Sequence, residues 1–454
     1  MTAQAEADRP IGYVELVRRN PGFRNLWNGQ IVSLLGDWFN LIGSAALITL
    51  LTGSGLAVGA LFVVRMLAPF AVSPLAGVLA DRQDRRRLLI LCDLARGVVV
   101  LGFLLVRSPD TIWLLYTLTA VQLAISGIFY PARNAILPDV VSEAELGAAN
   151  ALSGATWSVM LAVGAALGGL VAGLWGIYPS FVIDSASFFV SAFFIARVAY
   201  RTDPVLEMGR GGLRATLGQY GAGLSYLRDH LDVMGVAVQK GTVGLFVNGA
   251  FQVLQVAIAE RVFVIGEGGS TSLGLMYAVV GVGAGLGPLV ARRAVGDRLA
   301  GLRVALMVAF LLAALGLVTV APLASLGLVL AGTLVRAMGT GTIWVLSTQM
   351  LLQMVPGTVR GRVFSVEFAI FTLATAVGSA LGGWALDGTS LGITGLLTVM
   401  AGAALVPALL WGVGVATGRP RRWSAVGLEV DGPPWPGSEP AAALAEEGLN
   451  DELD

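Results

Sequence analysis

Charged residues, cysteine and histidine are all scarce in this chain of 454 residues. Only 13% of the residues are charged, about half the share in ordinary soluble domains, and 29 Lys+Arg balance 29 Asp+Glu. Without a positive excess to displace counterions from phosphate, no nucleic-acid partner is expected. The single cysteine excludes an intrachain disulfide and zinc sites built on cysteine pairs, and the single histidine excludes His-rich metal centres. We therefore expect no metal site.

Apolar residues make up 56% of the chain and are gathered in long runs. A helix needs about 20 apolar residues to span the hydrocarbon core of a bilayer. Twelve runs are long enough, at about 26–50, 56–78, 88–106, 112–132, 147–174, 178–198, 236–262, 271–293, 302–320, 323–348, 363–386 and 390–416. The polar start of the chain predicts no signal peptide before them. The sequence thus predicts an all-α integral membrane protein with twelve transmembrane helices.

Basic residues are distributed unequally between the connections of these runs. With the N-terminus inside, 23 of the 29 basic residues fall in cytoplasmic segments, and only Arg107 and Arg261 fall outside. Because basic residues accumulate on the inner side of membranes, both termini are predicted to face the cytoplasm. We expect a multi-pass protein of the cell membrane.

The longest internal connection divides the runs into six and six. The predicted organisation is a cytoplasmic N-terminal segment (1–24), a six-helix bundle (25–200), a cytoplasmic linker (201–235), a second six-helix bundle (236–418) and a disordered cytoplasmic tail (419–454). Apolar residues recur in the linker at steps of four and three, at Leu213, Leu217, Tyr220, Leu224 and Leu227. This spacing predicts an amphipathic helix that lies on the inner membrane surface and tethers the bundles.

The two halves share a short repeat. The segment 162–169 (AVGAALGG) returns 214 residues later as 376–383 (AVGSALGG), with seven of eight positions identical. Small residues at this spacing allow close helix packing, which could explain each copy alone. Because the copies fall in equivalent helices of the two halves, they indicate a duplication and a pseudo-symmetric pair of bundles, an architecture typical of secondary transporters.

The connection after the second run carries a recognisable motif. Residues 77–87 read GVLADRQDRRR, and this segment resembles the signature loop of the major facilitator superfamily, although Asp84 replaces its second glycine. The resemblance implies a gating loop formed by Gly77, Asp81, Arg82, Arg85 and Arg86. Asp81 would cap the N-terminus of a helix in the second half, and the arginines would lie near anionic headgroups.

Further motifs resemble the branch that contains macrolide-efflux proteins and the enterobactin exporter. They are Leu26-Trp27, 33–37 (SLLGD), 129–133 (FYPAR), 137–139 (LPD), 150–152 (NAL), 184–188 (DSASF) and 360–364 (RGRVF). The resemblance covers about residues 20–415. The chain departs from the superfamily at Gln122 and Ser126, where the fourth helix commonly has an arginine, and at Gly169, where the antiporter motif has proline.

The first run carries a polar stripe at membrane depth. Its members recur at steps of three and four, as Gln30, Ser33, Asp37, Asn40 and Ser44. A hydrogen-bonded helix seam would account for such a stripe. A cavity wall accounts better for five polar residues that include a carboxylate, because charge inside a bilayer is costly. We therefore predict that Gln30, Asp37 and Asn40 line a transport cavity and that Asp37 is the coupling carboxylate.

The second half offers a counterpart in its first run. Lys240, Asn248, Gln252 and Gln255 fall within a helical sector of about 120°. Lys240 is the only lysine of the chain and could instead extend to the membrane interface. Lys240, Asn248 and Gln252 complete the predicted cavity.

Other charged residues also fall inside the predicted spans. Arg65 and Arg336 would have to face water, a carboxylate or cargo, and an ion pair between Arg65 and Asp37 is expected at similar depth. Asp93 and Arg96, three residues apart, predict a local structural pair. Asp184 is interpreted as a cap near the start of the sixth helix, and Glu367 as a possible second titratable site.

Together these features predict a secondary transporter that exports an amphipathic or apolar small molecule of drug, macrolide or siderophore type. We expect alternating access, coupling to the proton gradient, no cofactor, contact with membrane lipids and a monomer. A lysophospholipid or lipid flippase of the same fold is the alternative. A membrane-embedded enzyme would need a catalytic motif, yet the sequence contains no HExxH or Walker loop. A non-transporting sensor would not need the polar stripe.

Overall fold

The computed structural model describes residues 12–199, 213–296 and 298–416. Within these ranges the regular elements are helices, and twelve of them are long and apolar enough to cross a membrane. The all-α fold with twelve spans is therefore confirmed. The predicted tail (419–454) and residues 1–11 of the predicted N-terminal segment lie outside the described residues.

The first half contains six spans and three short helices. Its elements are α2 (Tyr13–Arg19), α3 (Pro21–Thr52), α4 (Gly55–Arg82), α5 (Arg85–Leu101), η1 (Gly102–Leu105), η2 (Pro109–Thr111), α6 (Ile112–Val140), α7 (Glu143–Trp175) and α8 (Ile177–Ala196). Most of these helices extend several residues beyond the apolar runs, because polar and charged residues form their terminal turns.

The second half begins with the linker helix. Its elements are α9 (Leu213–Asp229), α10 (Leu231–Ala237), α11 (Gln239–Val243), the π-helical turn η3 (Gly244–Asn248), α12 (Gly249–Arg261), η4 (Glu267–Gly269), α13 (Ser270–Val295), α14 (Leu299–Val320), α15 (Leu326–Met354), α16 (Gly357–Gly388) and α17 (Gly392–Ala416). The run predicted at 236–262 thus consists of four consecutive helical segments, α10 to α12 with η3.

Side-chain caps fix several helix starts. The side chain of Asn20 accepts a hydrogen bond from the Phe23 amide at 2.9 Å, immediately before Pro21 at the first position of α3. Asp84 caps α5 in the same way, with 2.8 Å between its Oδ1 and the amide nitrogen of Arg87. Such caps satisfy amides that have no partner within the helix. This role explains the aspartate at position 84 of the signature loop.

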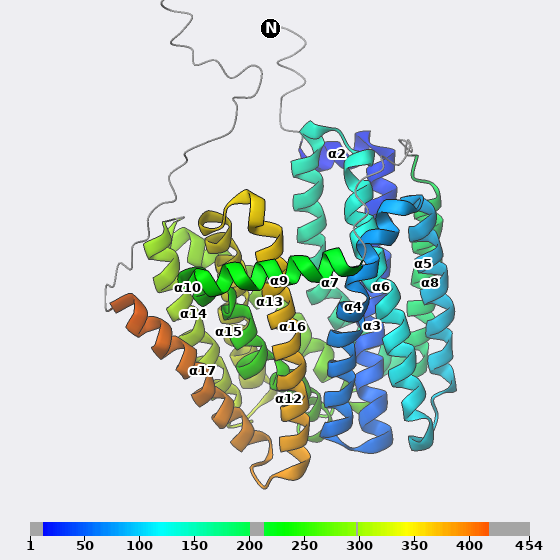
Figure 1. Cartoon of the computed structure of the whole chain (residues 1–454). Coiled ribbons are helices and arrows are strands. Elements are labelled where there is room, and N and C mark those ends of the chain that lie inside the picture. The colour runs from blue at the N-terminus through cyan, green and yellow to red at the C-terminus, as the bar shows by residue number, and fades with distance from the viewer. Residues whose placement is uncertain (1–11, 200–212, 297, 417–454) are drawn as a thin grey trace, which may run out of the picture. The chain divides into compact units, whose positions relative to one another are not determined.

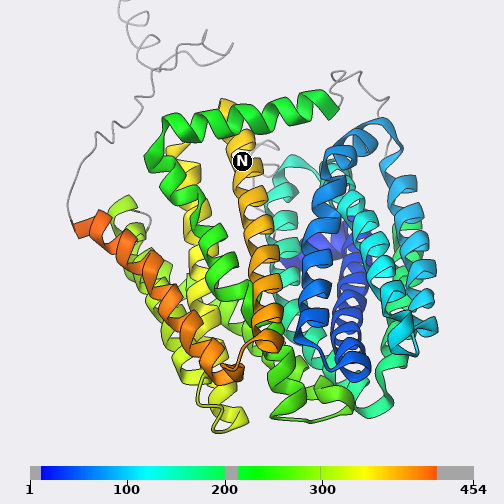
Figure 2. The same ribbon diagram turned by 60° about the horizontal axis from the view of Figure 1, so that its bottom comes forward.

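The spans pack as two six-helix bundles (Figure 1). In the first, α3 packs against α7 and α8, α4 against α6, and α5 against both α6 and α8. In the second, α15 packs against α13 and α14, and α16 packs against α12. The bundles meet where α7 contacts α13 and where α4 contacts α16, the latter pair seen as blue beside orange in Figures 1 and 2.

The glycine repeat lies at equivalent contacts in the two bundles. A methyl group on Gly169 of α7 would lie 2.6 Å from the carbonyl oxygen of Ser270 in α13, and one on Gly383 of α16 would lie 2.6 Å from that of Gly55 in α4. The preceding glycines, Gly168 and Gly382, meet α3 and α12 in the same manner. In each copy, therefore, one glycine packs against a helix of the same bundle and the next glycine packs against a helix of the opposite bundle.

The predicted linker contains the helix α9, and its position on the inner membrane surface stays a prediction. Helix α9 contacts α16 and α4, which belong to different halves, and Figure 2 shows it in green across the upper ends of the spans. Leu227 is buried and Tyr220 half-buried, whereas Leu224 is exposed. The side chains of Leu213 and Leu217 lie outside the described part of the chain.

Candidate functional site

The predicted polar stripe of α3 divides into two parts with different surroundings. Gln30 is buried, accepts a hydrogen bond from Arg133 of α6 and donates one to the carbonyl oxygen of Ser153 in α7 at 3.2 Å. These bonds tie three helices together. Gln30 therefore belongs to a helix seam, the alternative considered for the stripe, and not to a cavity wall.

Asp37 lies farther along α3 in a more open place. Its side chain is half-buried, and the hydroxyl of Tyr130 in α6 is 3.4 Å from its Oδ2. Asp37 also interacts electrostatically with Arg96 and Arg65. Its partial exposure within a transmembrane helix fits a carboxylate that contacts cargo or water.

The expected ion pair between Asp37 and Arg65 does not form. Both residues are described, and their charges interact, but no hydrogen bond or ion pair joins them. The reason is the helix packing, because α3 lies mainly against α7 and α8 while α4 lies against α6 and α16. Arg65 is half-buried and keeps its guanidinium available for another group.

The predicted pair of Asp93 and Arg96 is confirmed as a structural feature of the first bundle. Both side chains are fully buried and form an ion pair on α5. The Arg96 guanidinium lies between the rings of Phe129 and Phe188, with 4.2 and 4.3 Å to the ring centroids. Arg96 thus connects α5, α6 and α8, which is a role in packing.

The interpretation of Asp184 as a helix cap is wrong. The sixth span begins at Ile177, so Asp184 lies in its interior and is fully buried. It faces α3 at Gly36, where a methyl group would lie 2.5 Å from its Oδ1. Asp184 interacts electrostatically with Asp37 and lies beside Asn40. Asn40 is buried and accepts a hydrogen bond from Ser44 at 3.2 Å.

Lys240 is buried and does not extend to the membrane interface. Its Nζ lies 3.0 Å from Oε1 of Glu367 in α16 and donates a hydrogen bond to Thr348 of α15 at 2.8 Å. The ammonium also lies over the ring of Trp344, 4.5 Å from the centroid. The side chain therefore connects three helices, and Glu367, which the sequence suggested only as a titratable site, is its counter-ion.

The deeper residues of the seventh span surround Arg336. Asn248 accepts a hydrogen bond from Arg336 Nη1 at 2.7 Å, and the guanidinium lies 3.9 Å from the ring centroid of Phe251. Gln252 is half-buried and Gln255 is buried. The π-turn η3 lies between Lys240 and Asn248, so their relative orientation differs from that of a regular helix.

Two aromatic residues connect the halves at this level. Trp38 of α3 and Tyr277 of α13 have ring centroids 5.5 Å apart. Tyr277 is buried and interacts electrostatically with Arg65 of the first half and with Arg336 of the second. Sequence reasoning missed Trp38, Tyr130 and Tyr277, although each carries a polar atom inside an apolar run, which is the available signal.

The signature motif lies partly inside α4. The helix continues to Arg82. The surroundings of Gly77 and the side chains of Asp81 and Arg82 lie outside the described part, so the gating role of these residues stays a prediction. Arg85 pairs with Asp139 of α6, with 2.7 Å between Nη1 and Oδ2, and Arg86 donates to the carbonyl oxygen of Ala196. Arg85 and Arg86 thus bind the ends of α6 and α8 in the first bundle, in addition to the predicted attraction of their charges to lipid headgroups.

Hydrogen bonds join the halves at the end of the spans opposite α9. Asp387 of α16 accepts from Ser54 Oγ at 2.7 Å and from the amides of Gly55 and Leu56 at 2.9 and 2.8 Å. Nearby, Arg261 Nη2 donates to the carbonyl oxygen of Gly53 at 2.6 Å. The two halves are thus fastened at this end by charged groups on helix termini.

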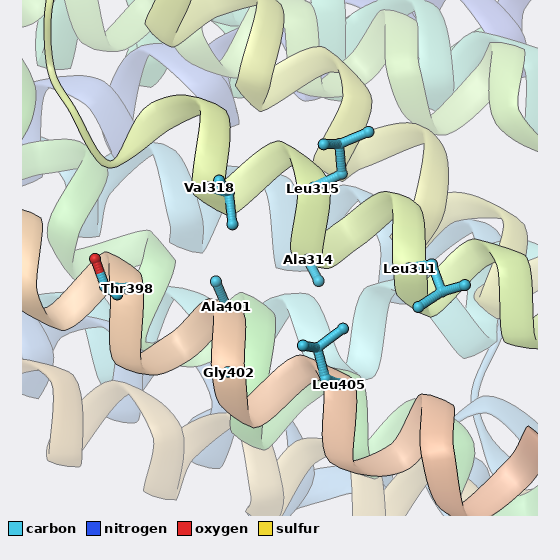
Figure 3. Close-up of a pocket in the computed structure, with 8 residues that line it drawn as sticks. All are labelled: Leu311, Ala314, Leu315, Val318, Thr398, Ala401, Gly402 and Leu405. Carbon is cyan, nitrogen blue, oxygen red and sulfur yellow. The ribbon is translucent and has the colours of Figure 1, made fainter.

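A separate pocket of about 460 Å³ lies between α14 and α17 (Figure 3). Its lining is Leu311, Ala314, Leu315, Val318, Thr398, Ala401, Gly402 and Leu405. The single hydroxyl, that of Thr398, donates to the carbonyl oxygen of Thr394 at 2.9 Å. The pocket therefore offers no free polar group to orient a ligand, in contrast to the region around Asp37, Arg65, Tyr277 and Arg336.

A family model described as transmembrane secretion effector matches residues 17–426. The chain is 26% identical over 362 residues to a putative bacilysin exporter, BacE, of Bacillus amyloliquefaciens (80% of this chain, 88% of that protein). It is 24% identical over 399 residues to the enterobactin exporter EntS of Shigella boydii (86% and 89%). A match to the uncharacterized transporter YfiS of Bacillus subtilis, 32% identical over 189 residues, covers 41% of this chain and 45% of YfiS.

Solved structures share the fold. A bacterial homologue of the human lysosomal transporter Spinster superposes with a TM-score of 0.69 at 15% identity, covering 90% of this chain and 99% of that chain. The resemblance to the macrolide-efflux and enterobactin-exporter branch and the twelve-helix transporter fold are therefore confirmed. The relatives are multi-pass membrane transporters of the efflux type and not enzymes.

Proposed function

The chain belongs to the transmembrane secretion effector family of the major facilitator superfamily, and we propose that it exports an amphipathic or apolar small molecule by alternating access, driven by the proton gradient. The observation that carries the proposal is the meeting of polar groups from both halves at membrane depth. Asp37 and Arg65 come from the first half, Tyr277 and Arg336 from the second, and Trp38 and Tyr277 join them.

Alternating access requires that the site become open on either side in turn. Contacts between the halves support this, since α4 against α16 and α7 against α13 meet at glycines that bring the two backbones close together. The hydrogen bonds around Asp387 close one end. By the distribution of basic residues, this closed end is the outer one, and α9 and both termini are cytoplasmic.

We assign proton coupling to Asp37. Its carboxylate is partly exposed inside a span and interacts electrostatically with Arg65, without an ion pair that protonation or cargo would have to break. Cargo of the type carried by the relatives, which are described as exporters of bacilysin and enterobactin, would enter beside it. The protein would work as a monomer without a cofactor.

Transport by purified protein in proteoliposomes tests the proposal. Candidate cargo is first selected by thermal stabilisation of the protein, and its movement is then followed with and without an imposed proton gradient. We expect gradient-driven transport that Asp37→Asn abolishes and that Asp110→Asn, a change at an exposed loop position, leaves intact. Undiminished, still pH-driven export by Asp37→Asn would refute the coupling role. Gradient-independent movement of lysophospholipid alone would instead identify a flippase.

A further inference from the structure

Two guanidinium groups of the central site form no ion pair with a carboxylate of the described residues. Asp93 neutralises Arg96, and Glu367 neutralises Lys240. Arg336, in contrast, hydrogen-bonds only the neutral side chain of Asn248, and its Nε has no partner among the described residues. Arg65 forms no hydrogen bond or ion pair within the described part of the chain.

The two arginines come from opposite halves and share a neighbour. Both interact electrostatically with the hydroxyl-bearing ring of Tyr277. Asp37 and Asp184 are electrostatic neighbours of Arg65, but no carboxylate is an electrostatic neighbour of Arg336. Arg336 therefore carries a positive charge without a neighbouring carboxylate, at a depth where an uncompensated charge is strongly disfavoured.

Apolar surface lies next to these charges. Trp38 is half-buried and packs against Tyr277, and Phe251 lies beneath the guanidinium of Arg336. An aromatic or aliphatic body can pack on such rings, while two guanidinium forks can hold an anionic group.

From this arrangement we infer that the cargo is an amphipathic organic anion, whose anionic group binds between Arg65 and Arg336 beside the Tyr277 hydroxyl and whose apolar body packs against Trp38. The inference rests on the proposed export function and names the chemical class of its cargo. An anion that touches an arginine of each half would also supply the attraction that draws the halves together around it.

Three probes with one shared body separate charge from hydrophobicity. They are 1-naphthoate (anionic), 1-naphthamide (neutral) and 1-naphthylmethylammonium (cationic), each titrated into the full-length protein in nanodiscs and followed by calorimetry. We expect naphthoate to bind about tenfold more tightly than the amide, the effect of one charge-assisted hydrogen bond. Equal affinity for the three probes, a preference for the ammonium or no binding of naphthoate overturns the inference.

Substitutions locate the selectivity. Arg65→Gln and Arg336→Gln should each remove about tenfold of the naphthoate affinity and leave the amide affinity unchanged. Arg107→Gln, at an exposed position that stacks on Tyr178, is the matched control and should change neither. Because Arg65 is half-buried and unbonded, its variant keeps the test decisive if Arg336→Gln does not fold. Naphthoate selectivity that survives Arg65→Gln contradicts the assigned site.

The same probes distinguish failure of this inference from failure of the exporter proposal. Binding is measured without a gradient. Selective naphthoate binding without any transport by wild-type proteoliposomes would contradict export and leave the anion site in place. Transport of the ammonium or amide probe alone would support export and overturn the anion site.

Discussion

Asp387 of the second half binds Ser54 of the first, with 2.7 Å between Oδ2 and Oγ, at the N-terminus of α4. The same carboxylate accepts two backbone amides from the first turn of that helix. A carboxylate at a helix N-terminus is stabilised by the unpaired amides and by the helix dipole. The contact therefore holds one state of the transporter at the end of the spans opposite α9.

Replacing this carboxylate should shift the balance between states. Asp387→Ala removes all three hydrogen bonds. We expect the state in which this end is closed to be destabilised by about 1–2 kcal/mol relative to the open state, a change of roughly 5- to 30-fold in the ratio of closed to open protein. Spin labels at Asp110 and Ser390, in a Cys92→Ala background, would report longer distances. Asp229→Ala, at an exposed position on α9, serves as the control. Distances identical to those of the wild type would contradict the role of Asp387.

The glycine repeat should not tolerate even the substitution of glycine by alanine. Gly169→Ala and Gly383→Ala each place a methyl group 2.6 Å from a backbone oxygen of the opposite half, a distance at which the helices must separate. We expect a loss of about 1–3 kcal/mol of stability in each variant, measured as a lower midpoint of thermal unfolding. Gly402→Ala introduces its methyl group where no atom lies within 4 Å and should not destabilise the protein. Equal midpoints in all three variants would exclude a close contact.

The buried pair of Lys240 and Glu367 predicts strong coupling between two substitutions. Lys240→Met leaves an uncompensated carboxylate and should cost about 3–5 kcal/mol, whereas Lys240→Met with Glu367→Gln should recover most of that loss. Unfolding of the two single variants and the double variant in one detergent gives the coupling energy. Additive losses would mean that the residues act independently.

Arg96 should be intolerant of lysine. Arg96→Lys keeps the charge beside Asp93 but loses the planar group between Phe129 and Phe188, so we expect a loss of about 1–2 kcal/mol of stability. Arg24→Lys, at an exposed position early in α3, is the control for the change of residue type. A lower thermal midpoint for Arg96→Lys alone is the expected result. Unchanged stability would show that the two rings contribute nothing through Arg96.

Features that depend on one helix were predictable from sequence. The twelve spans follow from apolar length, and the pair of Asp93 and Arg96 follows from three-residue spacing on α5. The linker helix follows from the spacing of its apolar residues. The glycine repeat also indicated the relation between the halves, because a duplicated segment repeats its contacts.

Features that depend on how different helices meet were not predictable. The ion pair of Lys240 with Glu367 joins residues 127 positions apart, and no periodicity connects them. The π-turn after Val243 changes the direction in which every later side chain of its span points, and a projection onto a regular helix cannot reproduce this change. The apolar run placed the start of α8 within one residue of Ile177, but the packing of Asp184 against Gly36 of α3 is a contact between helices that the run could not show. The separation of Asp37 from Arg65 likewise reflects helix packing and not their depth.

The backbone contacts at Gly169 and Gly383 also bear on how this two-bundle protein arose. The two copies of the repeat make the same kind of contact with the opposite half, a glycine against a backbone oxygen at the start of a helix. A single-copy ancestor that paired with itself would already have possessed both contacts. Two such copies fused into one chain would need a connector, and α9, which touches α4 and α16 at once, lies between them in the sequence.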